Sequence, residues 1–180
     1  MRELTVVRYP EPVLLKKAAR VERVTPDIRA FIAEMAELMR RSHGVGLAAP
    51  QVGVSLRIIV LETDDEKIHA VVNPRIIACE GRDTSAEGCL SFPLLHGEVT
   101  RAQRVTVSGV NPGGKKITLT GEGLWARAVQ HEIDHLDGVV FIDRVIPSSL
   151  YWVTGEKDEE GNYLTKPTDL EEARRFFAPR

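Results

Sequence analysis

Two histidines and a glutamate in the stretch VQHEIDHLDG, residues 129 to 138, have the types and spacing of a hydrolytic metal site. His131 and His135 are four residues apart, so on a helix both side chains project from one face. Both rings can therefore direct a nitrogen at one ion, while Glu132 lies beside the first ligand and can act on a water molecule. A catalytic metal usually has three protein ligands, so a third must come from elsewhere in the chain.

Two downstream positions correspond to third ligands in families of histidine-pair proteases. In one family a histidine follows the second ligand within the pattern H-x-x-G-x-x-H, but Phe141 stands at that position here and excludes it. In another family a glutamate lies about twenty residues further along, where this chain has Glu156. Its charged, turn-like surroundings favour an exposed surface residue instead.

A candidate third ligand lies upstream, in the stretch EGCLSFP of residues 87 to 93. A thiolate from Cys89 and two imidazoles would make a tetrahedral site with the fourth position open for water. Taken alone, Cys89 would be interpreted as a small buried apolar residue. Cys79 lacks comparable neighbours, and we expect it to be buried in that way. Two cysteines are too few for a disulfide scaffold, although one bridge remains an alternative.

Size and composition indicate a soluble globular protein. The chain has 180 residues, enough for one domain with a core, and its net charge of −2 gives no indication of nucleic acid or an anionic membrane as the main partner. No apolar run approaches the length of about 20 residues that spans a bilayer. The first residues alternate and carry charges, unlike the core of a signal peptide. We expect a cytoplasmic protein, with an organellar location as the alternative if a transit peptide has been removed.

The histidines need a helix, and the pattern of the chain predicts where it lies. An earlier helix begins with Thr25 as N-cap and Pro26 at its first position, and it ends near His43 and Gly44. Residues 44–53, rich in glycine, form a constrained loop or irregular strand. Strands rich in Val, Ile and Thr are predicted at 57–61, 69–73, 75–79, 104–110 and 116–120, with a turn at 111–116.

The histidine helix should begin near residues 121–124 and end at Gly138, followed by a short strand at 139–143. Thr168 and Glu171 form a capping-box pattern before a terminal helix at 170–177. Runs of strands with two or three helices outside them are typical of the α+β class. We expect a single domain, residues 1–180, with antiparallel or mixed sheets around the central helix, an N-terminal and a C-terminal helix. Residues 145–180 would be a C-terminal extension, whose role the sequence leaves open.

Three stretches together resemble the motifs of one enzyme family. GVGLAAPQVG (44–53), EGCLS (87–91) and QHEIDHLDG (130–138) are similar, in order and spacing, to the three motifs of peptide deformylases. The opening YPEPVLLKKA (9–18) is also similar, so the resemblance covers residues 9–144. With glycine as its second residue, EGCLS resembles the motif of the bacterial and organellar-type enzymes.

The resemblance implies that Cys89, His131 and His135 hold one divalent metal ion. In the family this is commonly Fe²⁺, and zinc, nickel or cobalt can occupy the site, whereas the ligand types alone would favour zinc. The implied substrate is the formyl group on the first methionine of a new polypeptide, and the products are formate and a free amino terminus. Transient association with the ribosome and the oligomeric state are left open, and no stable binding of nucleic acid or membrane is expected.

The resemblance also implies catalytic and substrate-binding roles for individual residues. Glu132 would move the proton, while the Gln51 side-chain amide and the Leu90 backbone N–H would stabilise the developing oxyanion. Histidine at position 96 departs from relatives with a substrate-contacting arginine nearby, and Arg127 is expected to reach solvent at the pocket rim. The residues expected to bind the peptide are Gly44, Val45, Gly46, Gly88, Leu124 and Ala128.

Two other functions remain as alternatives at this point. One is an H-E-x-x-H endopeptidase of another fold, for which the upstream EGC would be an accident. The other is a metal-binding module without catalysis, against which the intact set of site residues argues. Gln130 is expected to brace the site, and His43 and His69 are expected at the surface.

Overall fold

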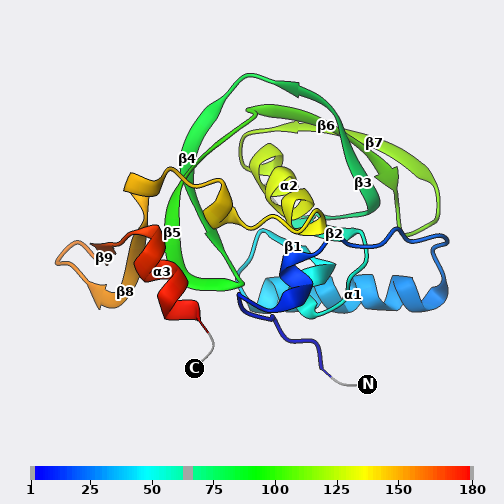
Figure 1. Cartoon of the computed structure of the whole chain (residues 1–180). Helices are drawn as coiled ribbons and strands as arrows, with labels where there is room; N and C mark the ends of the chain where they lie inside the picture. The colour runs from blue at the N-terminus through cyan, green and yellow to red at the C-terminus, as the bar shows by residue number, and fades with distance from the viewer. Residues whose placement is uncertain (1–2, 63–66, 179–180) are drawn as a thin grey trace.

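The structure is a computed structural model that describes residues 3–62 and 67–178, and it confirms the α+β class (Figure 1). These residues form three α-helices and two antiparallel sheets, of strand order β1-β2-β3-β6-β7 and β4-β5-β8-β9. The strands of the larger sheet are β1 (Gly46–Ala48), β2 (Ile58–Glu62), β3 (Ile68–Glu80), β6 (Arg104–Val110) and β7 (Lys116–Glu122). Those of the smaller sheet are β4 (Asp83–Cys89), β5 (Phe92–Arg101), β8 (Tyr151–Lys157) and β9 (Tyr163–Pro167).

The histidines lie on α2 (Gly123–Leu136), which confirms the expected central helix. Figure 1 shows α2 inside the curve formed by the strands of the larger sheet. Its apolar residues Val129, Ile133 and Leu136 share a core cluster with Ile59 and Val107 of that sheet. From Ala126 to Leu136 every residue except Gln130 is buried, so the polar side chains of this helix must find partners inside the protein.

The first helix, α1 (Pro26–Arg41), begins as predicted: the Thr25 hydroxyl accepts a hydrogen bond from the Ile28 N–H at 3.3 Å. Its end differs in detail, because His43 rather than Gly44 takes the left-handed conformation, with φ 55°. The N–H of Gly44 then reaches back to the carbonyl of Met39 at 3.0 Å, as in a Schellman motif. His43 is exposed, as expected, and His69 is half-buried.

Two strand predictions were wrong. Residues 69–73 and 75–79 form one long strand, β3, whose register shifts between Val72 and Arg75, where Asn73 has a φ of 53°. Such a bulge bends a strand without ending it. The expected strand at 139–143 is instead a 3-10 turn, η3 (Phe141–Asp143), because the Asp143 carboxylate caps the Val140 N–H at 3.1 Å while Phe141 is buried.

Two smaller expectations also need correction. Cys79 is exposed near the end of β3 rather than buried, because the outer half of that strand projects beyond the core. The N-cap of the terminal helix α3 (Leu170–Phe177) is Asp169, which accepts from the Glu172 N–H at 2.8 Å. The Thr168 hydroxyl instead donates to the Glu172 side chain, so the N-cap lies one residue later than predicted.

The C-terminal segment packs on the rest of the fold through an aromatic cluster around Phe92 of β5. Phe177 of α3 lies 5.2 Å from Phe92 between ring centroids, and Leu150 and Ala173 are buried in the same cluster. No helix among residues 3–62 and 67–178 has the length and apolar character needed to cross a membrane. The remaining short helices are η1 (Pro12–Leu15), η2 (Ala49–Val52) and η4 (Pro147–Ser149).

Gly138 ends α2, as predicted, and its conformation gives the first testable prediction. Its φ is 75°, and an added Cβ would lie 2.9 Å from backbone atoms of Leu15 and Lys16. Gly138→Ala should therefore lower the free energy of unfolding by about 2 kcal/mol or more, measured by urea denaturation. Gly155→Ala is the control: no described atom beyond its chain neighbours lies within 4 Å of the added Cβ. Equal losses in the two variants would contradict this account.

Candidate metal centre

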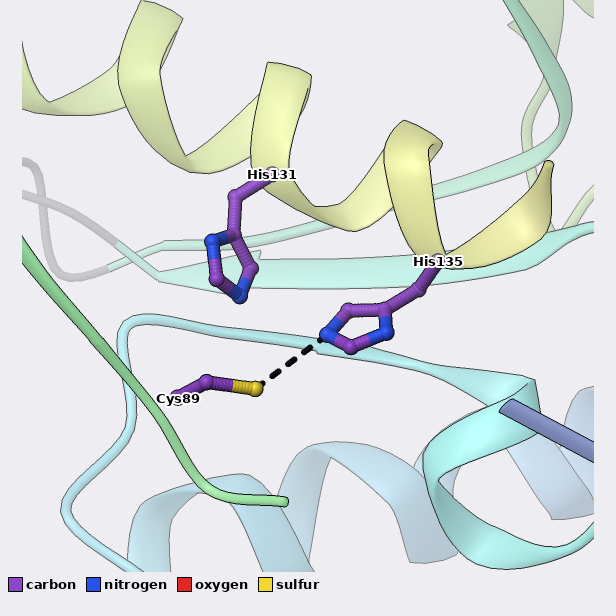
Figure 2. Close-up of side chains that lie close together, drawn as sticks. All are labelled: Cys89, His131 and His135. Atoms are coloured by element: carbon purple, nitrogen blue, oxygen red, sulfur yellow. Dashed lines mark hydrogen bonds between the residues drawn. The ribbon is translucent and has the colours of Figure 1, made fainter. Parts of the chain in front are cut away.

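The three predicted ligands come together between α2 and the end of β4. Figure 2 shows the rings of His131 and His135 projecting from one face of the helix toward Cys89. One ligand atom from each residue lies within 4.8 Å of the other two. The closest pair is Cys89 Sγ and His135 Nε2, at 3.2 Å. The spacing of four residues on α2 thus places two nitrogens and one sulfur around a single point.

The chemistry of this donor set fits a divalent transition-metal ion. His131 uses Nδ1 to hydrogen-bond Glu87 at 3.0 Å, which leaves Nε2 for a metal. Burial lowers the pKa of His135 well below its ordinary value, so that ring is neutral, as a ligand must be. For His131 burial also acts to lower the pKa, but hydrogen bonds to Cys89 and Glu87 outweigh it and raise the pKa. The Glu87 and Cys89 acceptors therefore favour a positive charge at the His131 ring.

Glu87 is the functional residue that the sequence reasoning missed. Its buried carboxylate accepts two hydrogen bonds from Arg101, at 2.8 and 3.0 Å, besides the contact with His131. Burial acts to raise the pKa of Glu87, but these hydrogen bonds outweigh it and lower the pKa to about 2. A charged acceptor on the outer nitrogen orients a ligating histidine. The alternation of a strand, which puts Glu87 and Cys89 on one face of β4, is the signal that could have revealed it.

Arg127 does not reach solvent at the pocket rim, as the sequence suggested, but is 8% exposed. Its guanidinium donates to Glu87 Oε1 at 2.8 Å, to Asp83 Oδ2 at 2.7 Å and to the Val99 carbonyl at 2.8 Å. These acceptors lie on β4 and β5, whereas Arg127 lies on α2. Because Cys89 also lies on β4, this clamp fixes the separation between the sulfur and the two histidines.

Two further polar residues of α2 attach the helix to its surroundings. Asp134 is paired with Arg101, at 2.5 Å, and with Arg144, at 2.8 Å. The Gln130 amide bonds both the N–H and the carbonyl of Ala102, at 3.0 and 2.9 Å, in the turn between β5 and β6. Gln130 thus braces the helix that carries the ligands rather than contacting them.

Glu132 is buried on α2 and lines the cavity beside the ligand cluster. It is 4% exposed, and its Oε2 has no hydrogen-bond partner among the described residues. Burial raises the pKa of Glu132 to about 7, although His131 acts in the opposite direction. Gly46 makes room for this side chain, because a Cβ there would lie 2.5 Å from Glu132 Oε1. A carboxylate with this pKa can take and return a proton near neutral pH.

Gln51 is held so that its amide N–H groups face the ligands. Its Oε1 accepts a hydrogen bond from the Ala48 N–H at 2.8 Å, which fixes the orientation of the amide. Nε2 then lies 3.5 Å from both Cys89 Sγ and Ser91 Oγ. Leu90 directly follows Cys89 in the turn between β4 and β5. Gln51 thus places an amide donor beside the cluster, and Leu90 lines the same cavity.

A cavity of about 380 Å³ opens beside the ligands. Val45 and Leu124 on its wall are 43% and 45% exposed, so they are available to a ligand rather than fully used in the core. His135 lies behind the cavity and is 1% exposed. All six residues expected to bind the peptide line the cavity, namely Gly44, Val45, Gly46, Gly88, Leu124 and Ala128, together with Gln51, Cys89, Leu90, His131 and Glu132.

Comparison with known proteins decides the family. Residues 3–150 match the family model described as polypeptide deformylase. The chain belongs to the polypeptide deformylase family. A peptide deformylase of Desulforudis audaxviator is 48% identical over 145 residues, which are 80% of this chain and 94% of that protein. One from Halothermothrix orenii is 49% identical over 147 residues, which are 81% and 96% of the two chains.

Solved deformylase structures have the same fold. The peptide deformylase from Thermotoga maritima superposes with a TM-score of 0.78 at 38% identity and covers 82% of this chain and 100% of its own. That from Legionella pneumophila gives 0.77 at 40% identity and covers 81% and 88%. Since the family match ends at residue 150, β8, β9 and α3 lie beyond it.

Metal affinity should depend on the charge of Glu87. Glu87→Gln should bind a divalent metal about 10- to 100-fold more weakly, because a neutral amide holds the His131 ring less firmly. Competition with a chelator of known affinity measures the change. Glu98→Gln, at an exposed position of β5, is the matched control and should bind metal as the parent does. Unchanged affinity in Glu87→Gln would show that Glu87 does not orient the ligand.

Proposed function

We propose that this chain removes the formyl group from the N-terminal methionine of new polypeptides, with Cys89, His131 and His135 as metal ligands. Members of the polypeptide deformylase family are metal-dependent hydrolases that act on formyl-methionyl peptides. The observation that carries the residue assignments is the convergence at one cavity of a three-ligand cluster, the buried Glu132 and the oriented Gln51 amide. A bound divalent ion would activate water and polarise the formyl carbonyl.

Glu132 carries the proton in this mechanism. Its unpartnered Oε2 accepts a proton from the attacking water, and the same carboxylic acid then donates it to the leaving amine. The bond that breaks joins the formyl carbon to the methionine nitrogen, and formate leaves with the oxygen of the water. Burial keeps bulk water from competing for the carboxylate.

Gln51 and Leu90 stabilise the negative oxygen of the transition state. The formyl oxygen gains charge as water adds, and donors already in place lower the barrier. Gln51 supplies Nε2–H, whose direction is set by the Ala48 N–H on the other end of the amide. Leu90 supplies its backbone N–H from the turn after Cys89.

The peptide lies as an extended strand between two glycine-rich segments. Gly46 begins β1 and Gly88 is the residue before the ligand Cys89, and both line the cavity. An extended chain can pair with such edges through its main chain. The methionine side chain enters the apolar slot formed by Val45, Leu124 and Ala128.

We propose Fe²⁺ as the native ion, with zinc, nickel or cobalt able to replace it. Sulfur and imidazole ligands accept all four ions, so the choice depends on supply and oxidation state as well as on the ligands. Metal analysis of protein purified without oxygen should find iron at about one ion per chain. Cys89→Ala should lose most of this metal, whereas Cys79→Ala, at the exposed cysteine, should retain it. Normal loading of Cys89→Ala would remove Cys89 from the ligand set.

Formate release from formyl-Met-Ala-Ala by the metal-loaded protein tests the function directly. Glu132→Ala should keep the metal but lose turnover by about 10²- to 10⁴-fold, the usual contribution of a general acid–base. Glu37→Ala, at an exposed position of α1, is the control and should be fully active. An active Glu132→Ala variant would exclude Glu132 as the proton carrier.

The endopeptidase alternative has little support, since Phe141 is buried in the core and Glu156 is exposed on β8. Cleavage of internal peptide bonds without formate release would nevertheless favour it, and metal binding without any hydrolysis would favour the non-catalytic module. We further propose that residues 1–180 act as one domain in the cytoplasm, near the ribosome from which the substrates emerge.

A further inference from the structure

Two of the three metal ligands touch one apolar cluster. Cys89 packs against the core cluster that contains Phe92 and Phe141, each of which is at most 1% exposed. Cys89 also pairs with Phe92 across β4 and β5. The ring of His131 lies over Phe141, with ring centroids 6.4 Å apart and an interplanar angle of 29°. An apolar shell around a metal site limits the access of water and holds the ligands in place.

Helix α3 supplies the outer side of this aromatic cluster (Figure 1). Phe177 meets Phe92 edge to face, with ring centroids 5.2 Å apart, and it meets Tyr9 in the same way at 6.4 Å. Phe92 in turn meets Phe141 at 5.3 Å and 83°. Aromatic pairs of this geometry contribute more than the burial of their area. The rings thus form a continuous series that runs from Phe177 on α3 to the ligand His131.

An ion pair ties the same helix to the segment that carries Phe141. The Arg174 guanidinium donates to Asp143 Oδ1 at 3.0 Å and to the Tyr9 hydroxyl at 3.1 Å. Asp143 is the last residue of η3, and its Oδ2 accepts from the Val140 N–H at 3.1 Å. The turn that presents Phe141 is therefore held on one side by its own cap and on the other by α3.

The residues of α3 that make these contacts share one face of the helix. Arg174 and Phe177 are three residues apart, the spacing of neighbours on a helix surface. Phe176 is 69% exposed, and the Arg175 side chain is 74% exposed and pairs with Glu171 of the same helix. The helix lies beyond residue 150, where the family match ends. The outer cover of the aromatic cluster therefore comes from a segment that the match does not contain.

We propose that α3 governs how long the bound metal ion is retained, with Phe177 and Arg174 as the positioning residues. Both hold the aromatic cluster against Cys89 and His131, so these ligands separate only when the cluster moves as well. A close-packed interior resists such movement, because each gap that opens forfeits contacts on both of its sides. This inference rests on the proposed function, in which Cys89, His131 and His135 hold the ion.

The rate at which the loaded full-length chain releases Co²⁺ to an excess of EDTA tests the proposal. Phe177→Ala should release the ion about three- to tenfold faster than the parent, a smaller effect than that of a group bonded directly to a ligand. The visible absorption spectrum of the bound Co²⁺ should also change, because it follows the geometry of the ligands. Phe177→Leu refills most of the volume and should restore most of the slow release. Arg174→Met keeps the apolar stem but loses both hydrogen bonds, and it should also release the ion faster.

Controls separate positioning of the ligands from general stability. Phe176→Ala and Arg175→Met change exposed neighbours on the same helix and should release Co²⁺ as the parent does. Ile32→Ala opens a cavity in the separate core cluster beneath α1. It should lower the free energy of unfolding but leave the release rate and the Co²⁺ spectrum unchanged.

Two results would overturn the proposal: release at the parent's rate from both Phe177→Ala and Arg174→Met, or equal acceleration in Ile32→Ala. If circular dichroism shows that Phe177→Ala does not fold, the comparison of Arg174→Met with Arg175→Met decides. A parent chain that binds no Co²⁺ would refute the ligand set of the proposed function and this inference together. A loaded parent whose variants retain the ion equally well refutes only the inference.

Discussion

The site depends on one buried carboxylate, that of Glu87, which connects the smaller sheet to the central helix α2. Glu87 lies on β4 of the smaller sheet, while α2 is packed in the core of the larger sheet. Its two oxygens lie within hydrogen-bond distance of Arg101, Arg127 and His131. Removing one partner from such a buried group costs about 3–5 kcal/mol, because the charges that remain are unpaired. Loss of one member would weaken the attachment of β4, which carries Cys89, to the helix that carries the two histidines.

The ligands were predictable because their geometry is local, whereas the network around them was not. His131 and His135 are related by one helical turn, and the helix could be recognised from its pattern and its final glycine. Cys89 needed a second motif, since nothing about a lone cysteine distinguishes a ligand from a core residue. Arg127 was misplaced because an arginine is most often exposed, and its partner Glu87 lies 40 residues away in sequence. Pairing over such separations follows from the tertiary fold and leaves no periodic signal.

The fold was recovered in part: the helices and most strands of the larger sheet followed from the pattern, whereas the four strands of the smaller sheet were not predicted. Regular periodicity and the Thr25 cap located α1, and glycine located the end of α2. The turn at Phe141 was mistaken for a strand, because a short apolar run predicts burial but not backbone conformation. The bulge at Asn73 was likewise hidden, since the residues on both sides of it have strand character. Tertiary packing determined the backbone conformation of each of these segments.

Because α2 is buried on nearly all sides, it has no face on which substitutions could accumulate without consequence. Val129 and Ile133 fill the core of the larger sheet, and His131 and Glu132 between them serve the site. A lost methyl group in the core would let the helix turn or slide by a fraction of an ångström and carry the ligands with it. The packing that stabilises the fold and the placement of the catalytic side chains therefore both depend on the position of α2. A substitution that stabilises the protein by repacking this helix would have to leave the helix axis where it is.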